Sequence, residues 1–373
     1  MSNKVRIIAN YLPQYHETIE NNNWWGKGYT DWVAVKNSTP LFEKHNQPKK
    51  PLNNNYYDLS IKDDIKWQAE LARKYNIDTF GIYHYWFSSE QNLLSKPAEI
   101  IKQNKDIDID YLFIWDNSTW KRTWSNVKEK FSNDMAPMYD SDKNEKNKGI
   151  LANLEYGNEK DWKRHFEYLL DFFNDERYIK EDNCPVFVFY NQDNKPEILK
   201  EMCACWNKWA KENGFNGMYF IGKKNTHNVK IVEHEFLYQP LWDAWIPQTF
   251  IQKVSNKLKE KCFSSNTKLQ IYDYDKVWNK ILKSAKKWKN ESIYYGAFVS
   301  YDDTPRRGEK GKVIVGSTPE KFGNYILKLV DLSEKYNKKF IFVTAWNEWG
   351  EGAYLEPDIT NKYGYLEQFL KIK

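Results

Sequence analysis

The sequence predicts an α/β fold of the (β/α)8 TIM-barrel type. Eight short runs rich in β-branched and aromatic residues recur along the chain, and helical patterns separate most of them. Strands that alternate with helices in this way indicate a parallel sheet. A length of 373 residues also fits one barrel with loop insertions. We therefore expect a single domain over residues 1–373, with an open, doubly wound sheet as the alternative.

The predicted elements alternate in order along the chain. The strands are expected at residues 5–11, 79–85, 111–115, 185–190, 218–221, 235–238, 294–299 and 340–345. The helices are expected at residues 63–75, 97–104, 161–173, 196–213, 274–288 and 319–336. Thr318 before Pro319 is the order expected of an N-cap followed by a proline in the first turn. Residues 126–159 are polar and weakly periodic, which predicts a long insertion, and residues 52–59 are expected to form a surface loop.

Composition narrows the class of protein. Lys and Arg number 56 and Asp and Glu 51, and no long basic block is present, so we expect no nucleic-acid partner. The first apolar run is too short for a signal peptide, and no stretch approaches the roughly 18 apolar residues that span a bilayer. We therefore expect a cytoplasmic protein without an integral membrane segment.

No cofactor or metal is expected. Neither G-x-G-x-x-G nor G-x-x-x-x-G-K-[ST] occurs, and Cys184, Cys203, Cys205 and Cys262 form no Cys-x-x-Cys pair. We interpret these cysteines as reduced, buried thiols. The triplet Asp140-Ser141-Asp142 resembles the metal-binding DxD of glycosyltransferases, but such triplets are common. The triplet Glu233-His234-Glu235 lacks a third ligand nearby, so solvated charge is the preferred interpretation.

Aromatic and polar residues gather where the predicted strands end. The chain has 17 Trp, 26 Tyr and 20 Phe. In TIM barrels the active site forms at the carboxyl ends of the strands, and Trp and Tyr offer sugars both an apolar face and a polar atom. This pattern predicts a saccharide-binding site. The expected substrate-binding residues are Tyr11, Gln14, His16, Trp24, Trp25, Asp31, Trp32, His84, Tyr85, Trp86, Trp115, Asp116, Asn117, Gln239, Asp303, Arg306, Trp346, Asn347 and Trp349.

Glu348 and Glu351 are the expected catalytic residues. Making or breaking a glycosidic bond requires a proton donor and a base or nucleophile, and two carboxylates in different environments can supply both. A separation of three residues within a turn can direct both carboxylates into one pocket. Two glutamates on a surface loop are the plain alternative. Their position after the last strand, flanked by Trp346 and Trp349, favours the catalytic interpretation.

Other candidates have structural alternatives of similar weight. His84 and His16 either bind a sugar hydroxyl or are hydrogen-bonded residues of the core. Arg306 and Arg307 either hold a carboxylate or phosphate of the substrate, or pair with Asp302 and Asp303. Asp116 and Asn117 either bind hydroxyls or begin a turn.

Several segments together resemble the WbsX-like proteins. They are residues 8–16 (IANYLPQYH), 24–32 (WWGKGYTDW), 81–87 (GIYHYWF), 303–307 (DTPRR) and 344–352 (TAWNEWGEG). The matches extend from about residue 7 to residue 358, which is nearly the whole chain. WbsX-like proteins are similar to the endo-α-mannosidases of glycoside hydrolase family 99, which have a (β/α)8 barrel. They are often encoded with O-antigen or capsule genes, and many are labelled glycosyltransferases.

The resemblance implies a mechanism. Glu348 would deprotonate the 2-hydroxyl of the sugar, which attacks its own anomeric carbon, and Glu351 would protonate the leaving oxygen. The reaction would retain configuration through a 1,2-anhydro sugar. The sequence departs from the pattern in two places: Gly350 stands where the hydrolases usually carry His, and residues 115–120 differ from the Glu-Asn-Trp typical of WbsX-like proteins. Both differences predict a different substrate pocket.

Three functions are therefore expected, in this order. The first is a retaining glycosidase or transglycosidase that acts on an α-linked bacterial surface polysaccharide, such as O-antigen of lipopolysaccharide or capsule, or on its precursor. The second is a sugar-nucleotide-dependent glycosyltransferase, and the third is a non-catalytic glycan-binding barrel. Each takes an oligo- or polysaccharide as its partner.

Overall fold

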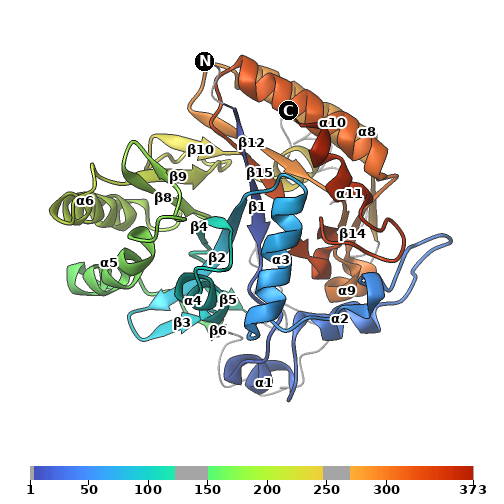
Figure 1. The fold of residues 1–373 in the computed structure, drawn as a ribbon, viewed down its shortest axis with the longest axis horizontal. Helices are drawn as coiled ribbons and strands as arrows, with labels where there is room; N and C mark the ends of the chain where they lie inside the picture. Colours follow the sequence, from blue (N-terminus) through green and yellow to red (C-terminus); the bar gives the residue numbers. More distant parts are fainter. Residues whose placement is uncertain (1–3, 122–149, 247–268, 373) are drawn as a thin grey trace, which may run out of the picture. The chain divides into compact units, whose positions relative to one another are not determined.

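The computed structural model describes residues 4–121, 150–246 and 269–372 (Figure 1). All eight predicted strands are present, with ends within a few residues of those expected. They are β1 (Arg6–Tyr11), β2 (Thr79–Ser88), β4 (Asp110–Trp115), β8 (Cys184–Phe189), β9 (Tyr219–Lys223), β10 (His234–Phe236), β12 (Ile293–Phe298) and β15 (Phe340–Thr344). Their side chains are almost entirely buried, as expected of parallel strands covered on both faces.

The eight strands form a closed parallel barrel. Their order is β1-β15-β12-β10-β9-β8-β4-β2, and β1 also pairs with β2, so the sheet returns on itself. The β1–β2 register places Ile8 opposite Thr79, and β2 continues beside β4 with Thr79 opposite Asp110. The predicted barrel is therefore confirmed, and the open sheet is excluded by the β1–β2 pairing.

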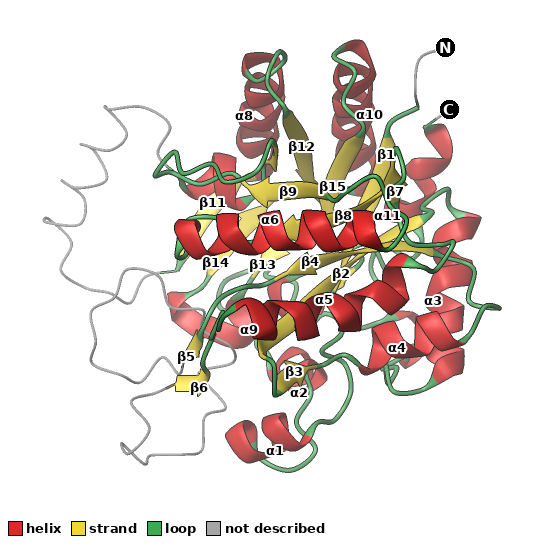
Figure 2. Cartoon of the chain, turned by 90° about the vertical axis from the view of Figure 1, so that its left-hand side faces the viewer, coloured by secondary structure: helices red, strands yellow, loops and turns green. Residues whose placement is uncertain are grey.

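The six predicted helices are also present, each within two residues of the expected ends. They are α3 (Lys62–Lys74), α4 (Lys96–Gln103), α5 (Glu159–Phe173), α6 (Pro196–Glu212), α8 (Tyr274–Lys287) and α10 (Pro319–Lys335). Thr318 caps α10 by accepting a hydrogen bond from the Lys321 amide, as its place before Pro319 predicts. Asn158 and Asp161 form a capping box at the start of α5. Figure 2 shows α5 and α6 side by side, and the rings of Phe166 and Trp206 join them.

Short elements lie between the main ones. The short strands are β3 (Gln91–Leu93), β5 (Trp120–Lys121), β6 (Ile150–Ala152), β7 (Lys180–Glu181), β11 (Gln270–Asp273), β13 (Tyr301–Asp302), β14 (Lys312–Val315), β16 (Asn347–Glu348) and β17 (Ala353–Tyr354). The short helices and turns are α1 (Ile19–Trp25), α2 (Asp31–Asn37), η1 (Leu52–Asn54), η4 (Leu241–Trp245), α9 (Thr304–Arg307), η5 (Gly308–Lys310), η6 (Trp349–Glu351), α11 (Gly364–Glu367) and η7 (Phe369–Lys371).

Four expectations need correction or lie partly beyond the described chain. Residues 52–59 are not wholly a surface loop, because η1 forms there and Tyr57 and Leu59 are buried. Of the expected insertion, residues 150–159 contain β6, which pairs with β5, and the first residue of α5. The rest of the insertion lies outside the described residues, as do the triplet at 140–142 and Cys262. Cys203 is buried as expected, but the other two described cysteines are only half-buried.

The chain divides into two compact units. Unit 1 consists of Met1–Arg6, Asp31–Tyr56 and Leu237–Lys373, and unit 2 of Ile7–Thr30 and Tyr57–Phe236. Across the described ranges, no helix has the length and apolar character needed to cross a membrane.

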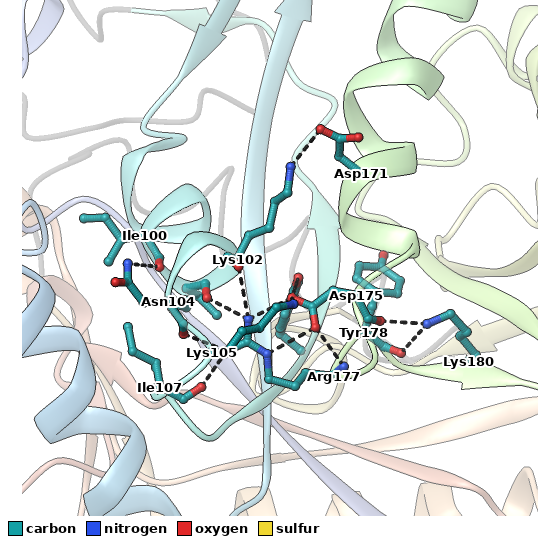
Figure 3. A network of polar contacts seen from close by, with 12 residues as sticks. Ile100, Lys102, Asn104, Lys105, Ile107, Asp171, Asp175, Arg177, Tyr178 and Lys180 are labelled. Carbon is teal, nitrogen blue, oxygen red and sulfur yellow. Dashed lines mark hydrogen bonds and ion pairs between the residues drawn. The ribbon is translucent and has the colours of Figure 1, made fainter.

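Unit 2 contains a polar network around Arg177 that anchors its loops (Figure 3). The guanidinium donates to the carbonyls of residues 101, 102, 104 and 107 over 2.6–3.4 Å, and to the buried Asp175 carboxylate at 2.7 Å and 3.2 Å. The Arg177 carbonyl in turn accepts from the Tyr111 amide, at the amino end of β4. Conserved polar contacts at that end of a TIM barrel serve stability, so we assign the network a structural role.

Candidate active site

Unit 1 brings three carboxylates onto one guanidinium. Arg306, on α9, donates from Nη2 to Asp31 Oδ2 at 2.7 Å and to Glu348 Oε1 at 2.9 Å. Its Nη1 donates to Glu351 Oε1 at 3.3 Å. The side chains of Arg306, Asp31 and Glu348 are 8%, 4% and 7% exposed, whereas that of Glu351 is 25% exposed. We call these four residues the carboxylate–arginine cluster.

The two glutamates converge because of the turn that carries them. Asn347–Glu348 pairs with Ala353–Tyr354 in a small antiparallel hairpin, and η6 forms the turn between these strands. Gly352 closes the turn with a φ of 56°, a left-handed conformation that glycine adopts without strain. Glu348 Oε1 accepts a hydrogen bond from the Glu351 amide at 3.2 Å, so the first glutamate fixes the turn that presents the second.

Arg306 is held by the acidic residues before it. Asp302 Oδ1 accepts from the Thr304 amide at 3.1 Å and from its hydroxyl at 2.6 Å, which fixes the start of α9. The Asp303 carbonyl then accepts from the Arg306 amide at 3.1 Å. Asp302 Oδ2 also contacts His45 Nε2 at 2.8 Å and accepts a hydrogen bond from the side-chain amide of Gln47 (Nε2) at 2.6 Å. Sequence analysis missed His45 and Gln47, since nothing in their local sequence signals a partner so distant along the chain.

Gly350 lies directly against the guanidinium. A Cβ at this position would be 2.6 Å from Arg306 Nε and 2.8 Å from Cζ, closer than a real side-chain carbon approaches such atoms. This contact accounts for the departure from the hydrolase pattern: a histidine at position 350 would overlap the guanidinium as it lies here.

The cluster is electrostatically unbalanced, because three carboxylates share the single positive charge of Arg306. Burial is the largest influence on the pKa of the Glu348 carboxyl and raises it, Arg306 lowers it, and the neighbouring Glu351 and Asp31 raise it, with a net value of about 8. Desolvation and like charges both disfavour the ionised form of a carboxyl group. The protonated form of Glu348 is therefore favoured near neutral pH.

The aromatic residues that flank the glutamates are packed. Trp349 stacks on Tyr354 with ring centroids 3.7 Å apart, its indole nitrogen donates to Glu356 at 2.7 Å, and Trp32 lies 5.5 Å from it. Trp346 and Asn347 are fully buried. These neighbours make the expected substrate-binding residues Trp32, Trp346, Asn347 and Trp349 part of the support of the turn in this conformation.

The two arginines of the DTPRR segment differ in their partners. Arg307 pairs with Asp303 at 3.2 Å, as the structural alternative predicts, whereas Arg306 joins the cluster. Asp303 also accepts from Tyr301 Oη at 3.1 Å and from the Lys312 amide at 2.5 Å, and burial raises the pKa of its carboxyl to about 6. This expected substrate-binding residue therefore ties α9 to β14.

Gln239 is bound within its own turn. Its side-chain amide donates to Asp243 Oδ2, and its side-chain oxygen accepts from the Asp243 amide at 3.3 Å. Gln239 is 1% exposed, and burial raises the pKa of the Asp243 carboxyl. The geometry therefore gives this residue a structural partner at the carboxyl end of β10.

In unit 2, His84 has the features of a core residue. Its Nε2 lies 2.8 Å from Nε2 of His165 on α5, and both imidazoles are buried. Trp86 stacks on His165 with ring centroids 4.3 Å apart and an interplanar angle of 2°. Desolvation lowers the pKa of both histidines, that of His84 to about 3. Of the two interpretations of His84, the buried hydrogen-bonded pair is the one that this geometry favours.

The ends of β4 and β1 show further bound side chains. Asp116 accepts from Ser118 Oγ at 2.6 Å and from Trp120 Nε1 at 3.3 Å, and burial raises its pKa. Asn117 Oδ1 accepts from the Asn191 main-chain amide at 2.7 Å, a bond that joins the segments following β4 and β8. The remaining expected residues of this unit are placed as follows: Tyr11 donates to Gln68 at 2.7 Å, Trp115 donates to the Trp86 carbonyl, Tyr85 contacts Trp120, Trp24 meets Trp120 edge-on, and Gln14 is buried.

Three buried polar side chains near β1 have atoms that are unpaired within the described residues. They are both amide atoms of Asn10, Nδ1 of His16 and Nε1 of Trp25. Asn10, His16 and Trp25 are 1%, 4% and 7% exposed. Buried polar atoms are nearly always hydrogen-bonded in native proteins. The assignment of His16 and Trp25 as substrate-binding residues stays a prediction.

Lys223 is a polar residue of unit 2 that sequence analysis missed. It ends β9, and its ammonium lies 3.3 Å from the centroid of the Tyr190 ring. Burial lowers the pKa of this lysine to about 7, while Asp116 and Asp193 raise it. Lysines are so frequent in this chain that its position carried no signal. In the ranges described, no cluster of three His, Cys, Asp or Glu side chains has the arrangement of a metal site.

The chain is similar in sequence to proteins of Xanthomonas campestris. The proteins called "Uncharacterized protein WxcX" from two strains of Xanthomonas campestris pv. campestris are each 26% identical over 368 residues, covering 97% of this chain and 48% of theirs. The chain thus spans about half the length of these curated relatives.

The similarity between this chain and solved structures extends to the fold alone. The GH99 endo-alpha-mannosidase from Bacteroides thetaiotaomicron has a TM-score of 0.54 at 13% identity, covering 98% of this chain and 96% of that one. A glycoside hydrolase-like protein also has a TM-score of 0.54 at 13% identity, with 99% and 94% covered. A sequence profile of one family, described as "Glycosyltransferase WbsX", matches residues 7–369. The chain therefore belongs to the WbsX family.

Proposed function

We propose that the chain cleaves or transfers an α-glycosidic bond, with retention, in a bacterial surface polysaccharide such as O-antigen or capsule, or in its precursor. The observation that carries this proposal is the convergence of Glu348 and Glu351 on one guanidinium, at 2.9 Å and 3.3 Å. Two carboxyl groups held this close, one buried and one partly exposed, have the different environments that acid–base catalysis at a sugar requires.

The resemblance assigns the roles, and the reaction starts from the form in which Glu348 is ionised and Glu351 carries a proton. Glu348, once ionised, is a strong base because burial raises its pKa, so it takes the proton of the sugar 2-hydroxyl. The 2-oxygen attacks the anomeric carbon, and the bond to the leaving oxygen breaks. Glu351 gives its proton to that oxygen and can regain one from solvent, because its side chain is 25% exposed. Water or an acceptor hydroxyl then opens the 1,2-anhydro ring and gives its proton to Glu351, while Glu348 returns its proton to the 2-oxygen. This step restores the original configuration of the sugar and the starting state of both carboxyl groups.

The second candidate is a sugar-nucleotide-dependent glycosyltransferase, which the family name favours. Such an enzyme must bind a diphosphate, and Arg306 and Arg307 are the expected ligands. Arg307 pairs with Asp303. The Arg306 guanidinium already faces three carboxylates, whose negative charge repels a phosphate. The charge of the cluster therefore supports the glycosidase over the transferase at this site.

The test uses oligosaccharides with α-linkages prepared from bacterial O-antigen and capsule, with products followed by mass spectrometry and anomeric NMR signals. Glu348→Gln and Glu351→Gln should each lower turnover at least about 100-fold, since positioned acids and bases contribute factors of that size or more. Glu309→Gln, an exposed glutamate in η5, is the matched control and should keep full activity.

Three outcomes contradict the proposal. Full activity in Glu351→Gln on a turned-over substrate would remove the acid from the mechanism. Tight binding of UDP or GDP, with product formed only from a sugar nucleotide, would establish the transferase instead. Glycan binding that is unchanged in both glutamine variants, without chemistry on any substrate tested, would indicate a glycan-binding barrel.

A further inference from the structure

We infer that Arg306 is the positioning residue of the glutamate pair, and that residue 350 is glycine because the Arg306 guanidinium occupies the space of its side chain. The catalytic meaning of this inference rests on the proposed function, but the physical coupling between positions 306 and 350 does not.

Arg306 holds three carboxylates in place, and we call this arrangement the clamp. Its two terminal nitrogens reach carboxylates on three different elements: Asp31 at the start of α2, Glu348 on β16 and Glu351 in η6. A guanidinium is planar and presents its donors in a fixed fork, so it sets the directions of the groups that it binds. A lysine ammonium in its place would supply the charge without fixing the two glutamates relative to one another.

Gly350 is needed for its lack of a side chain and not for its backbone conformation. Its φ is not among the positive values found at eight other glycines of the described chain, so alanine would fit the backbone there. What opposes alanine is the guanidinium, since Nε and Cζ of Arg306 lie 2.6 Å and 2.8 Å from the position of a Cβ. The turn and the arginine therefore fit each other only as a pair.

The clamp also sets the charge that the glutamates experience. Asp31 and Glu351 face Glu348 as like charges, and Arg306 is the cation beside it. Beyond Glu351 lie Tyr301, Asp303, Arg307 and Lys312, which interact electrostatically with one another or with this glutamate. Removing the charge of Arg306 takes this cation away from Glu348 but leaves Asp31 and Glu351 beside it, so Glu348 loses its proton at a higher pH. Activity that needs ionised Glu348 then moves to higher pH as well.

The experiment is a double-mutant cycle of Arg306→Ala and Gly350→Ala, read by the urea midpoint of unfolding, which requires no substrate. In the wild-type background Gly350→Ala should lower the midpoint. In the Arg306→Ala background the same substitution should produce no further shift, because the clashing group is gone. Arg307→Ala provides the matched control background: this arginine binds Asp303, so Gly350→Ala should remain as harmful there as in the wild type.

Activity measurements add a readout that a purely structural role would not change. Gly350→Ala should lower turnover about 100-fold, the loss expected when catalytic groups shift by about an ångström. Arg306→Gln should move the limb of the pH–rate profile that reports ionisation of the base to higher pH, and Arg306→Lys should move this limb less. If Arg306→Ala does not fold, Arg306→Gln replaces it in the cycle.

The outcomes separate this inference from the proposed function. Equal harm from Gly350→Ala with and without Arg306, or no harm in the wild type, would overturn the inference, even in an active enzyme that needs both glutamates. Coupling between the two positions in a protein without any activity on glycans would uphold the pairing and overturn the proposed function.

Discussion

Acid should destabilise unit 2 through its buried imidazole pair. His84 and His165 are held neutral in the fold, because burial lowers the pKa of His84 from 6.5 to about 3 and that of His165 well below 6.5. In the unfolded chain both imidazoles regain ordinary values. The native state therefore binds fewer protons than the unfolded state below about pH 6.5. The stability contributed by the neutral pair is complete above this pH and is lost as the pH falls.

The size of the effect follows from proton linkage. Each imidazole that stays neutral in the fold but ionises on unfolding lowers the free energy of unfolding by about 1.4 kcal/mol for each pH unit below its unfolded pKa. Between about pH 6.5 and pH 5 this amounts to about 2 kcal/mol for one histidine and about 4 kcal/mol for the pair. Such a loss is a large share of the roughly 5–15 kcal/mol that stabilises a typical domain.

Urea unfolding, followed by tryptophan fluorescence between about pH 5 and pH 8, measures the effect as the slope of the free energy of unfolding against pH. Other groups titrate in this range, so the wild type is compared with a variant that carries both His84→Leu and His165→Phe. The variant should be less stable at neutral pH but lose about 4 kcal/mol less on acidification. His227→Gln, at an imidazole that is 67% exposed, is the control and should leave the slope unchanged. Parallel curves for the wild type and the double variant would refute the reasoning.

Other predictions concern stability and its dependence on pH. Arg177→Ala should lower the free energy of unfolding by about 3–5 kcal/mol, since it removes the buried partner of the Asp175 carboxylate and leaves it, among the described residues, only the exposed Lys105 as an ion-pair partner, while Lys102→Ala, at an exposed ion pair, should change it by less than about 1 kcal/mol; equal effects in urea titrations would contradict this. The carboxyl pKa of Asp303 is raised from 3.8 to about 6, so its protonated form is favoured in the fold and its contribution is lost as the pH rises through that range. Relative to Asp303→Asn, the wild type should therefore lose about 3 kcal/mol between about pH 4 and pH 7, and a constant difference would argue against the shift. Gly296→Ala should cost at least about 2 kcal/mol in the same assay, because its Cβ would lie 1.9 Å from the Leu237 carbonyl oxygen.

The barrel could be predicted because its signals are local. A run such as Phe340–Thr344 contains mostly β-branched and aromatic residues, and it comes directly after a helix whose start Thr318 and Pro319 mark. Burial on both faces of a parallel strand requires such runs wherever the strand lies in the barrel. The loop at 52–59 was harder to predict, since its asparagines suggested exposure while Tyr57 and Leu59 are buried by contacts distant in sequence.

The site was predictable only in part, for a related reason. The glutamates and Arg306 stood out by type and by position after a strand, but the partner of each depends on the fold. Arg306 reaches Asp31, which lies 275 positions away along the chain, and His45 reaches Asp302 across 257 positions. Residue type alone left the two arginines of DTPRR equivalent, and only their directions distinguish them. The reason for glycine at position 350 likewise lies on another element.

The Arg177 network has a consequence for how this part of the chain can diverge. Four of its hydrogen bonds end on main-chain carbonyls, which every amino acid possesses. Substitutions at residues 101, 102, 104 and 107 therefore leave these acceptors in place, and the network itself does not restrict the residue type there, although burial restricts Ile101 and Ile107. An insertion or deletion within this stretch would move the carbonyls and break the network. Relatives should accordingly vary in residue type at its exposed positions but keep the same loop length, together with the pair Asp175 and Arg177.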